Sequence, residues 1–362
     1  MSRFCGFQTN GLFITDKSIK SIPGLRYAPC CWHGSNYSEI DRSSWTTDDW
    51  TDPCSYCLQQ ESDGRNSSMR MFANDLVAGI SIDDHRPVYL VIDYSNACNG
   101  ACGMCNSMSS STIAKIMRQE RSNNVRVPNV KQQDFFDAIS KIDYSNIKMI
   151  RFRGGEPLYV DFHKKVLDMM PDPSKIEVIY TTNGTIYPDQ EWIDIAKRFK
   201  KIRFSISVDG VRDKFDYIRT KLSWQVFDEN VRKLIAIPGL NISSNLECTV
   251  SPVNLYYYDE VFKYLLELKS INKSMDLRWH ACHDDWDLSN ATPNLRTLFS
   301  DKYGSNFYIS KVLGTLPFDS DKYQMFVNSV DAHERRFDLD GSNVFPEVWK
   351  TIIDRDMVRS MT

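Results

Sequence analysis

The sequence predicts an α/β fold built on a parallel sheet of six strands. From about residue 86 onward, short apolar runs rich in β-forming residues alternate with helical patterns, whereas residues 1–75 lack this periodicity. The strand candidates cover residues 88–94, 149–153, 177–181, 202–208, 244–250 and 277–282. The helical patterns lie near residues 131–142, 160–169, 190–200, 224–236 and 258–269. This alternation favours right-handed crossovers and a sheet that either stays open or curls into a partial barrel.

Composition narrows the class of protein. With 362 residues, of which 42% are hydrophobic, the chain can form a barrel and a smaller module. Its net charge of −3 predicts no nucleic-acid partner, and no apolar run approaches the roughly 20 residues that would predict a membrane partner. The N-terminus lacks the apolar core of a signal peptide, so the expected location is the cytoplasm. In a reducing cytosol, the ten clustered cysteines predict metal or iron–sulfur ligands rather than disulfides.

Three of these cysteines directly follow the first predicted strand. Cys98, Cys102 and Cys105 have the spacing CxxxCxxC, and Gly100 and Gly103 allow the loop to bend tightly. Three thiolates can hold three irons of a cubane and leave the fourth iron open to a ligand. The alternative is a structural zinc site, which needs a fourth ligand that the loop does not contain, or a set of unligated thiols.

Further motifs follow the next strands, where an α/β protein places its chemistry. The second strand ends in Gly154-Gly155-Glu156-Pro157, and the third in Thr182-Asn183-Gly184. The fourth contains Ser205-Ile206-Ser207-Val208-Asp209-Gly210 and is followed by Arg219. Glu156 offers an anion to an ammonium group, and bare glycines admit a ligand close to the backbone. The guanidinium of Arg219 suits a carboxylate.

In this order and at these strand ends, the motifs resemble those of the radical S-adenosylmethionine (SAM) superfamily across residues 88–255. The resemblance implies a partial (β/α)6 TIM-like barrel with a [4Fe–4S] cluster on Cys98, Cys102 and Cys105. It also implies that Met104 packs near the adenine of SAM, in place of an aromatic residue found in many relatives. The residues expected to bind SAM are Met104, Gly154, Gly155, Glu156, Asn183, Ser205, Ser207 and Arg219.

The resemblance further implies a reaction. In the family, the reduced cluster gives one electron to SAM, which breaks into methionine and a 5′-deoxyadenosyl radical that abstracts hydrogen from a substrate. The chain is therefore expected to be a radical SAM oxidoreductase or transforming enzyme, served by an electron donor such as flavodoxin or ferredoxin. Whether SAM is consumed or regenerated is left open.

The N-terminal cysteines resemble the auxiliary-cluster segment, SPASM or twitch, that accompanies some radical SAM barrels. In most relatives this segment follows the barrel, whereas here it would lead. The resemblance implies an auxiliary [4Fe–4S] cluster on Cys5, Cys30, Cys54 and Cys57, with Cys31 as a spare thiol. A small zinc module with the same four thiolates is the alternative.

These assignments divide the chain into three parts. Residues 1–75 are expected to form the auxiliary-cluster module, and residues 86–285 the radical SAM partial barrel. Residues 286–362 are expected to pack on the barrel as a C-terminal extension.

The sixth predicted strand ends in a polar rim that contains His280 and Cys282. Strand alternation predicts that these two side chains share a face, so one could accept a proton and the other could donate a hydrogen atom to a product radical. The alternative is an ordinary buried strand with a polar loop. The expected substrate is a small polar or sugar-like molecule. A peptide or protein side chain is the second possibility, and an electron-transfer iron–sulfur protein without SAM chemistry is the third.

Overall fold

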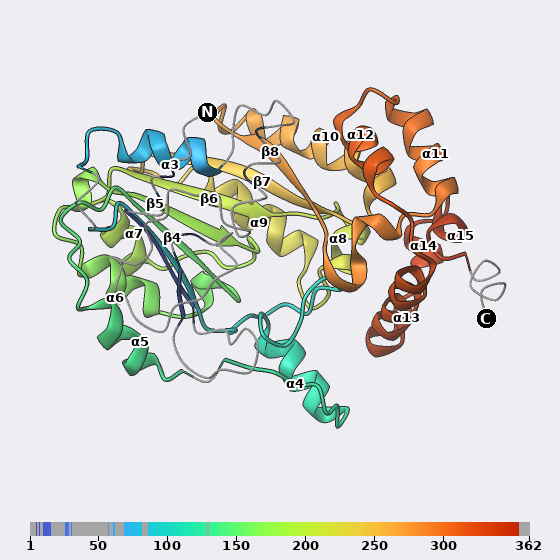
Figure 1. The fold of residues 1–362 in the computed structure, drawn as a ribbon, viewed down its shortest axis with the longest axis horizontal. Coiled ribbons are helices and arrows are strands. Elements are labelled where there is room, and N and C mark those ends of the chain that lie inside the picture. Colours follow the sequence, from blue (N-terminus) through green and yellow to red (C-terminus); the bar gives the residue numbers. More distant parts are fainter. Residues whose placement is uncertain are drawn as a thin grey trace.

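The computed structural model describes residues 10–15, 26–28, 69–81, 86–128 and 130–354, together with Cys5, Phe7, Cys30, Cys57 and Glu61. Within them, eight strands form one sheet in the order β2-β1-β3-β4-β5-β6-β7-β8 (Figure 1). Seven of these strands run parallel, and β2 pairs antiparallel with β1 at one edge. The other edge is β8, so the sheet is not closed and the predicted α/β partial-barrel fold is confirmed.

All six predicted strands are present. They are β3 (Tyr89–Tyr94), β4 (Met149–Gly154), β5 (Glu177–Thr182), β6 (Lys201–Ser207), β7 (Ile242–Val250) and β8 (Asp276–Ala281). The sequence analysis missed β1 (Gly11–Thr15) and β2 (Arg26–Ala28), which lie in the segment without clear periodicity. Leu12 and Ile14 are nevertheless fully buried, because β1 extends the sheet beside β3.

Helices cover one face of the sheet along most of its length. They include all five predicted ones: α5 (Gln132–Ile139), α6 (Phe162–Asp168), α7 (Gln190–Ala196), α9 (Trp224–Leu234) and α10 (Tyr258–Lys269). Two further helices, α4 (Ser111–Gln119) and α8 (Asp213–Ile218), follow β3 and β6. Alternate strand residues such as Phe152, Phe204 and Leu246 pack against these helices in the main hydrophobic core.

The opposite face of the sheet is covered differently. In Figure 1, α3 (Met69–Val77) lies above the sheet, while α5, α6 and α7 lie below it. Ala73 and Val77 of α3 pack with Phe7 against Val91, Met149 and Ile179 in a second, smaller core. This core covers only the amino-terminal part of the face, and polar residues follow it toward the carboxyl ends of the strands.

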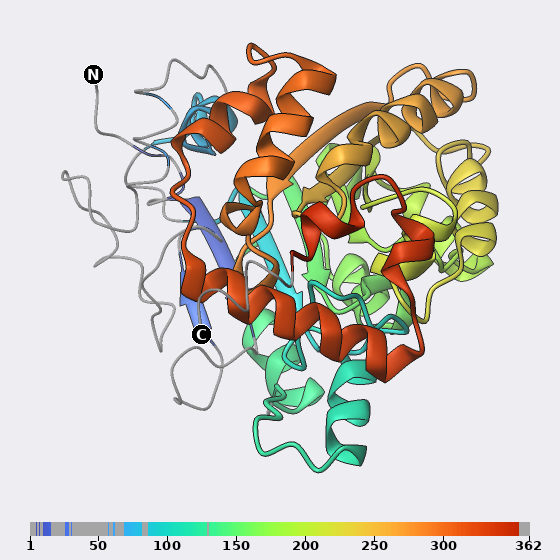
Figure 2. The same ribbon diagram turned by 90° about the vertical axis from the view of Figure 1, so that its right-hand side faces the viewer.

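The C-terminal part is helical, which the sequence analysis could not assign. It contains α11 (Pro293–Tyr303), α12 (Tyr308–Thr315), α13 (Ser320–Phe337), α14 (Gly341–Val344) and α15 (Trp349–Ile352). Figure 2 shows the long orange-red α13 crossing in front of the cyan loop that follows β3. None of the helices in the described part of the chain is long and apolar enough to cross a membrane.

Candidate active site

The cysteine loop lies at the carboxyl end of β3 and is fixed along both of its sides. On one side, the Cys98 carbonyl accepts a hydrogen bond from the Thr112 hydroxyl at the start of α4 (2.7 Å). On the other, the Ala101 amide donates to Thr220 O and the Gly103 amide to Ile218 O, both at 2.8 Å. The loop is therefore held by the segment that also carries Arg219.

The loop thiols form a single electrostatic group with Arg219. Burial raises the pKa of Cys98 and Cys102 to about 11, and the Arg219 guanidinium acts in the opposite direction on both. The two thiols also influence each other, and Cys105 influences Cys98. A cation beside buried thiols favours the thiolate form that iron requires. Among the described residues, no group of three His, Cys, Asp or Glu side chains is arranged to hold a single metal ion. A cubane does not require such a group, because each of its thiolate ligands binds a different iron.

Glu156 joins the ends of β4 and β5. Its buried carboxylate accepts hydrogen bonds from the Thr182 hydroxyl (2.8 Å), the Asn183 amide (2.6 Å) and the Leu158 amide (3.1 Å). Burial raises the pKa of Glu156 to about 7, although these hydrogen bonds act to lower it. The side chain is therefore held rigidly, and it can change protonation near neutral pH.

The glycines before Glu156 allow the end of β4 to pack closely against the chain's own backbone. That they also admit a ligand stays a prediction. A Cβ on Gly154 would lie 2.5 Å from Tyr94 O, and Gly154 has a φ of +130°, which favours glycine. The Gly155 amide donates to Ser95 O (3.0 Å) and the Glu156 amide to Ala97 O (2.8 Å). These contacts bind the end of β4 to the residues that lead into the cysteine loop.

Asn183 connects the third strand end to the same loop. Its amide nitrogen donates to Asn99 Oδ1 at 2.8 Å and lies 4.0 Å from the Cys98 sulfur. Its amide oxygen accepts from the Thr185 hydroxyl (2.7 Å), which also accepts from the Asn99 side chain (2.9 Å). Asn183 thus adjoins Cys98, the predicted cluster ligand.

Arg219 forms a buried ion pair with Asp209 (2.6 Å). Burial opposes a charge on Arg219, but Asp209 and the nearby Cys102 raise the pKa of its guanidinium. The Nε of Arg219 is buried and has no hydrogen-bond partner among the described residues. Asp209 also accepts from the Thr249 amide (2.8 Å), which connects the pair to β7.

Three further residues are expected to bind SAM: Ser205, Ser207 and Met104. The Ser205 hydroxyl is buried and donates to Asn245 Oδ1 of β7 at 3.3 Å. Ser207 is half-buried at the end of β6, two positions farther along the same face. Met104 is half-buried and packs against the main core from the cysteine loop.

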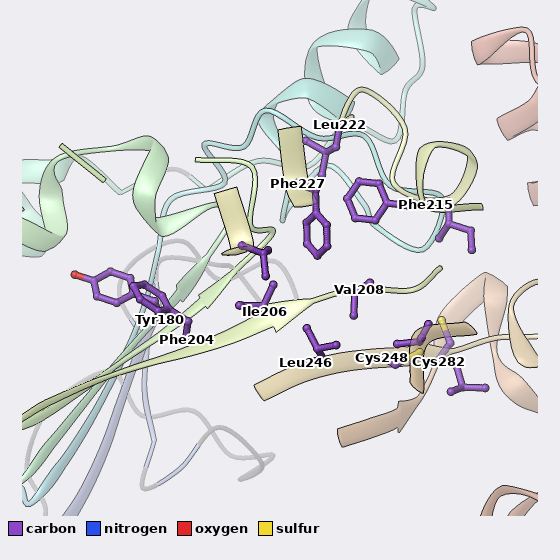
Figure 3. Packing of buried hydrophobic residues seen from close by; sticks show 14 of the residues in the cluster. Tyr180, Phe204, Ile206, Val208, Phe215, Leu222, Phe227, Leu246, Cys248 and Cys282 are labelled. Carbon is purple, nitrogen blue, oxygen red and sulfur yellow. The ribbon is translucent and has the colours of Figure 1, made fainter. Parts of the chain in front are cut away.

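His280 and Cys282 have different surroundings, contrary to the predicted alternation. The His280 imidazole is 53% exposed, and its Nε2 lies 2.6 Å from Glu247 Oε2. Since β8 ends at Ala281, the alternation does not continue to Cys282, whose thiol donates to the carbonyl of the next residue, His283 (3.4 Å). Figure 3 shows Cys282 beside Cys248 in the hydrophobic core, where burial raises the pKa of Cys282 well above its ordinary value.

This geometry agrees with a comparison of the sequence with known families. Residues 92–267 match the model of the radical SAM superfamily. This part of the chain, just under half of it, resembles a radical SAM domain. The matched family implies a [4Fe–4S] cluster and SAM as the groups that this site would hold. The residues around the loop fit these groups, because three thiols, a buried carboxylate and a buried guanidinium with an unused N–H converge there.

Individual relatives of the radical SAM domain are distant. An uncharacterized protein of Methanocaldococcus jannaschii, MJ0907, is 27% identical over 201 residues, which are 52% of this chain and 62% of that protein. Streptococcus suis SuiB bound to S-adenosylmethionine is similar over 72% of this chain and 60% of SuiB, with 17% identity and a TM-score of 0.39. TYW1 with a lysine–pyruvate adduct bound matches 70% of this chain and 82% of TYW1, with 13% identity and a TM-score of 0.35.

Part of the predicted auxiliary-cluster segment lies near the radical SAM domain. Cys5 and Cys30 pack against the second core. Cys5 and Cys57 lie within electrostatic range of Arg70, which forms an ion pair with Glu61. Cys54 and the spare Cys31 are outside the described residues, so the predicted ligand set stays a prediction.

Sequence reasoning assigned no role to several residues that build the site. Asn99 and Asp209 were visible within the motifs, but nothing in the sequence gave their partners. Nothing in the sequence predicted a role for Glu247, because a single acidic residue in an apolar strand can equally pair with a neighbour or face solvent. Trp286 lies under the cysteine loop, where a Cβ on Gly103 would be 2.6 Å from its ring, and this contact joins segments far apart in the chain.

Proposed function

We propose that the chain is a radical SAM enzyme that cleaves SAM reductively and removes a hydrogen atom from a small polar substrate. The observation that carries this proposal is the meeting of Cys98, Cys102, Glu156 and Arg219 at adjacent strand ends inside a radical SAM domain. When bound, the cluster and SAM supply the electron and the 5′-deoxyadenosyl radical.

The roles of the chain's own residues follow from their contacts. Cys98, Cys102 and Cys105 ligate the cluster as thiolates, and the Arg219 cation next to them stabilises that negative charge. Glu156 is held by three hydrogen bonds and offers a fixed carboxylate to the amino group of SAM. The unused Nε–H of Arg219 is available to an acceptor such as the carboxylate of SAM.

On the substrate side, His280 is the better placed of the two predicted catalytic residues. Its imidazole is accessible and is oriented by Glu247, as a proton acceptor requires. Cys282 is buried in the helix-side core, so a hydrogen-atom donor role would require the substrate to reach that core.

The proposal is tested with anaerobically reconstituted protein, SAM and dithionite, by mass spectrometric measurement of 5′-deoxyadenosine. The wild type should form it, and Cys102→Ala should not, because two thiolates hold a cubane poorly. The matched control is Cys248→Ala, which removes a buried thiol from the core outside the loop and should retain formation. Equal formation by wild type and Cys102→Ala would contradict the proposal.

We also propose an auxiliary [4Fe–4S] cluster on Cys5, Cys30, Cys54 and Cys57. The proximity of Cys5 and Cys57 to one guanidinium supports it. Iron analysis should give about eight irons per chain in the wild type and about four in Cys5→Ala/Cys57→Ala, if each cluster holds four. Bound zinc, or equal iron content in the two proteins, would contradict this second cluster.

A further inference from the structure

Polar contacts between neighbouring strands recur across the sheet on the face opposite the main helical layer. In β4 and β5, Arg151 Nε donates to the Thr181 hydroxyl at 3.1 Å. In β6 and β7, the Ser205 hydroxyl contacts Asn245, whose amide nitrogen donates to Glu247 at 2.5 Å. In β7 and β8, Glu247 pairs with His280.

These contacts lie between the second core and the cysteine loop. Arg151 and Ile179 are register partners on β4 and β5, and Ile179 belongs to the second core that α3 covers. At the other end, His280 lies within electrostatic range of Asp209, the ion-pair partner of Arg219. These residues form a polar band that extends from the second core to the Asp209–Arg219 ion pair beside the thiols. The band comprises Arg151, Thr181, Ser205, Asn245, Glu247 and His280.

The charged residues of the polar band differ in the number of partners that they have. Glu247 forms hydrogen bonds with His280 and Asn245. Burial acts to raise the pKa of Glu247, but these two partners and the Arg151 cation lower it below its ordinary value. Arg151 has one hydrogen bond, from Nε, and forms no ion pair with another residue of the described chain. Its two terminal amino groups therefore form no hydrogen bond with another described residue.

We propose that Arg151 binds an oxyanion group of the substrate, a carboxylate or a phosphate, on this face of the sheet. A guanidinium suits either group, because its two parallel N–H bonds match two oxygens of one anion. The Glu247–His280 pair lies on the loop side of Arg151 and hydrogen-bonds a hydroxyl or amine of the same molecule. This inference rests on the proposed function and narrows its substrate to an anionic, polar small molecule.

The test measures binding by isothermal titration calorimetry, with reconstituted protein and SAM present. The probes are glucose 6-phosphate, gluconate and glucose, which present a phosphate, a carboxylate and neither. The variants are Arg151→Gln, which removes the cation, and Arg198→Gln as the matched control. Arg198 is an exposed arginine that pairs with Asp168 away from this face.

We expect at least one of the two anionic probes to bind the wild type more tightly than glucose. That probe should lose about tenfold or more in affinity in Arg151→Gln, because a charge-assisted hydrogen bond is lost, and keep its affinity in Arg198→Gln. The probe that binds identifies phosphate or carboxylate as the group. If neither anion exceeds glucose, or if Arg151→Gln binds as the wild type does, the inference is wrong.

The same preparations separate this inference from the proposed function. Formation of 5′-deoxyadenosine by the wild type, together with binding that does not depend on Arg151, would overturn only the inference. Binding that depends on Arg151 in a protein that never cleaves SAM would support the anion site and contradict the proposed function.

Discussion

The two faces of the sheet use alternate residues of the same strands for opposite purposes. Phe204 and Ile206 of β6 point into the helix-covered core, whereas Ser205 between them belongs to the polar band. Parallel strands are usually buried on both faces and apolar throughout. Here only one face is apolar near the strand ends. Near the strand ends, the burial of apolar side chains therefore comes mainly from the helix-covered face, whereas the other face carries polar side chains there.

The largest expected effect is the loss of packing on the apolar face. Phe204 is fully buried, and its ring lies beside those of Tyr180 (Figure 3) and Trp192. Phe204→Ala should lower the free energy of unfolding by about 4 kcal/mol, because a large cavity remains. Chemical denaturation followed by circular dichroism measures this change.

The neighbouring residue provides the control for the polar face. Ser205→Ala should change the free energy of unfolding by about 1 kcal/mol or less, since it removes one long hydrogen bond. Similar losses in the two variants would show that the faces contribute equally to stability, contrary to the comparison.

The next effect concerns the buried ion pair where the two faces meet the cysteine loop. Arg219→Gln should cost about 3 kcal/mol, because the fully buried Asp209 is left without its cation. The double variant Arg219→Gln/Asp209→Asn removes both charges and should recover part of this loss. A double-mutant cycle of denaturation measurements gives the coupling, and additive losses would mean that the pair contributes no coupling.

Sequence patterns predicted the strands of the sheet better than the contacts between its polar side chains. Apolar residues, nearly continuous in β3 and alternating with polar ones in β6, predict β3 to β8 correctly, because each strand has at least one face that packs in the core. The five-residue β1 was missed because it is isolated in a cysteine-rich segment, and only its neighbour β3 explains its burial. The motifs placed Glu156 and Asn183 just after the ends of β4 and β5, and Arg219 lies at the end of α8, which follows β6.

The partners of these residues could not be predicted in the same way. Glu156 contacts residues 26 and 27 positions later, and the Arg151 and Glu247 side chains come from strands that are not adjacent. Such contacts depend on strand order and sheet curvature, which a local pattern does not contain. Strand alternation also failed at Cys282, because the chain turns directly after β8.

A smaller effect is expected from the protonation of Glu156. Its pKa of about 7, raised by burial, means that the carboxylate loses its charge as the pH falls below 7. If this carboxylate binds the amino group of SAM, SAM affinity should fall about tenfold per pH unit below 7, which corresponds to about 1.4 kcal/mol. Equilibrium dialysis with labelled SAM from pH 5.5 to 8.5 measures the profile. Glu156→Gln should bind SAM weakly with a flat profile over the same range, and a profile equal to that of the wild type would exclude Glu156 as its cause.

The smallest effect is expected at the surface, where α13 meets α4 across the cysteine loop. Arg336 forms two hydrogen bonds to Glu120, at 2.7 and 2.8 Å, and both side chains are partly exposed. Glu120→Gln should therefore cost about 0.5 kcal/mol at low salt and less at high salt, as measured by denaturation. SAM cleavage should be unchanged, because α13 is also held by buried contacts of His333 with Thr220 and of Ser329 with Trp286. A loss above 2 kcal/mol would mean that this exposed ion pair, rather than those buried contacts, fixes α13 over the strand ends.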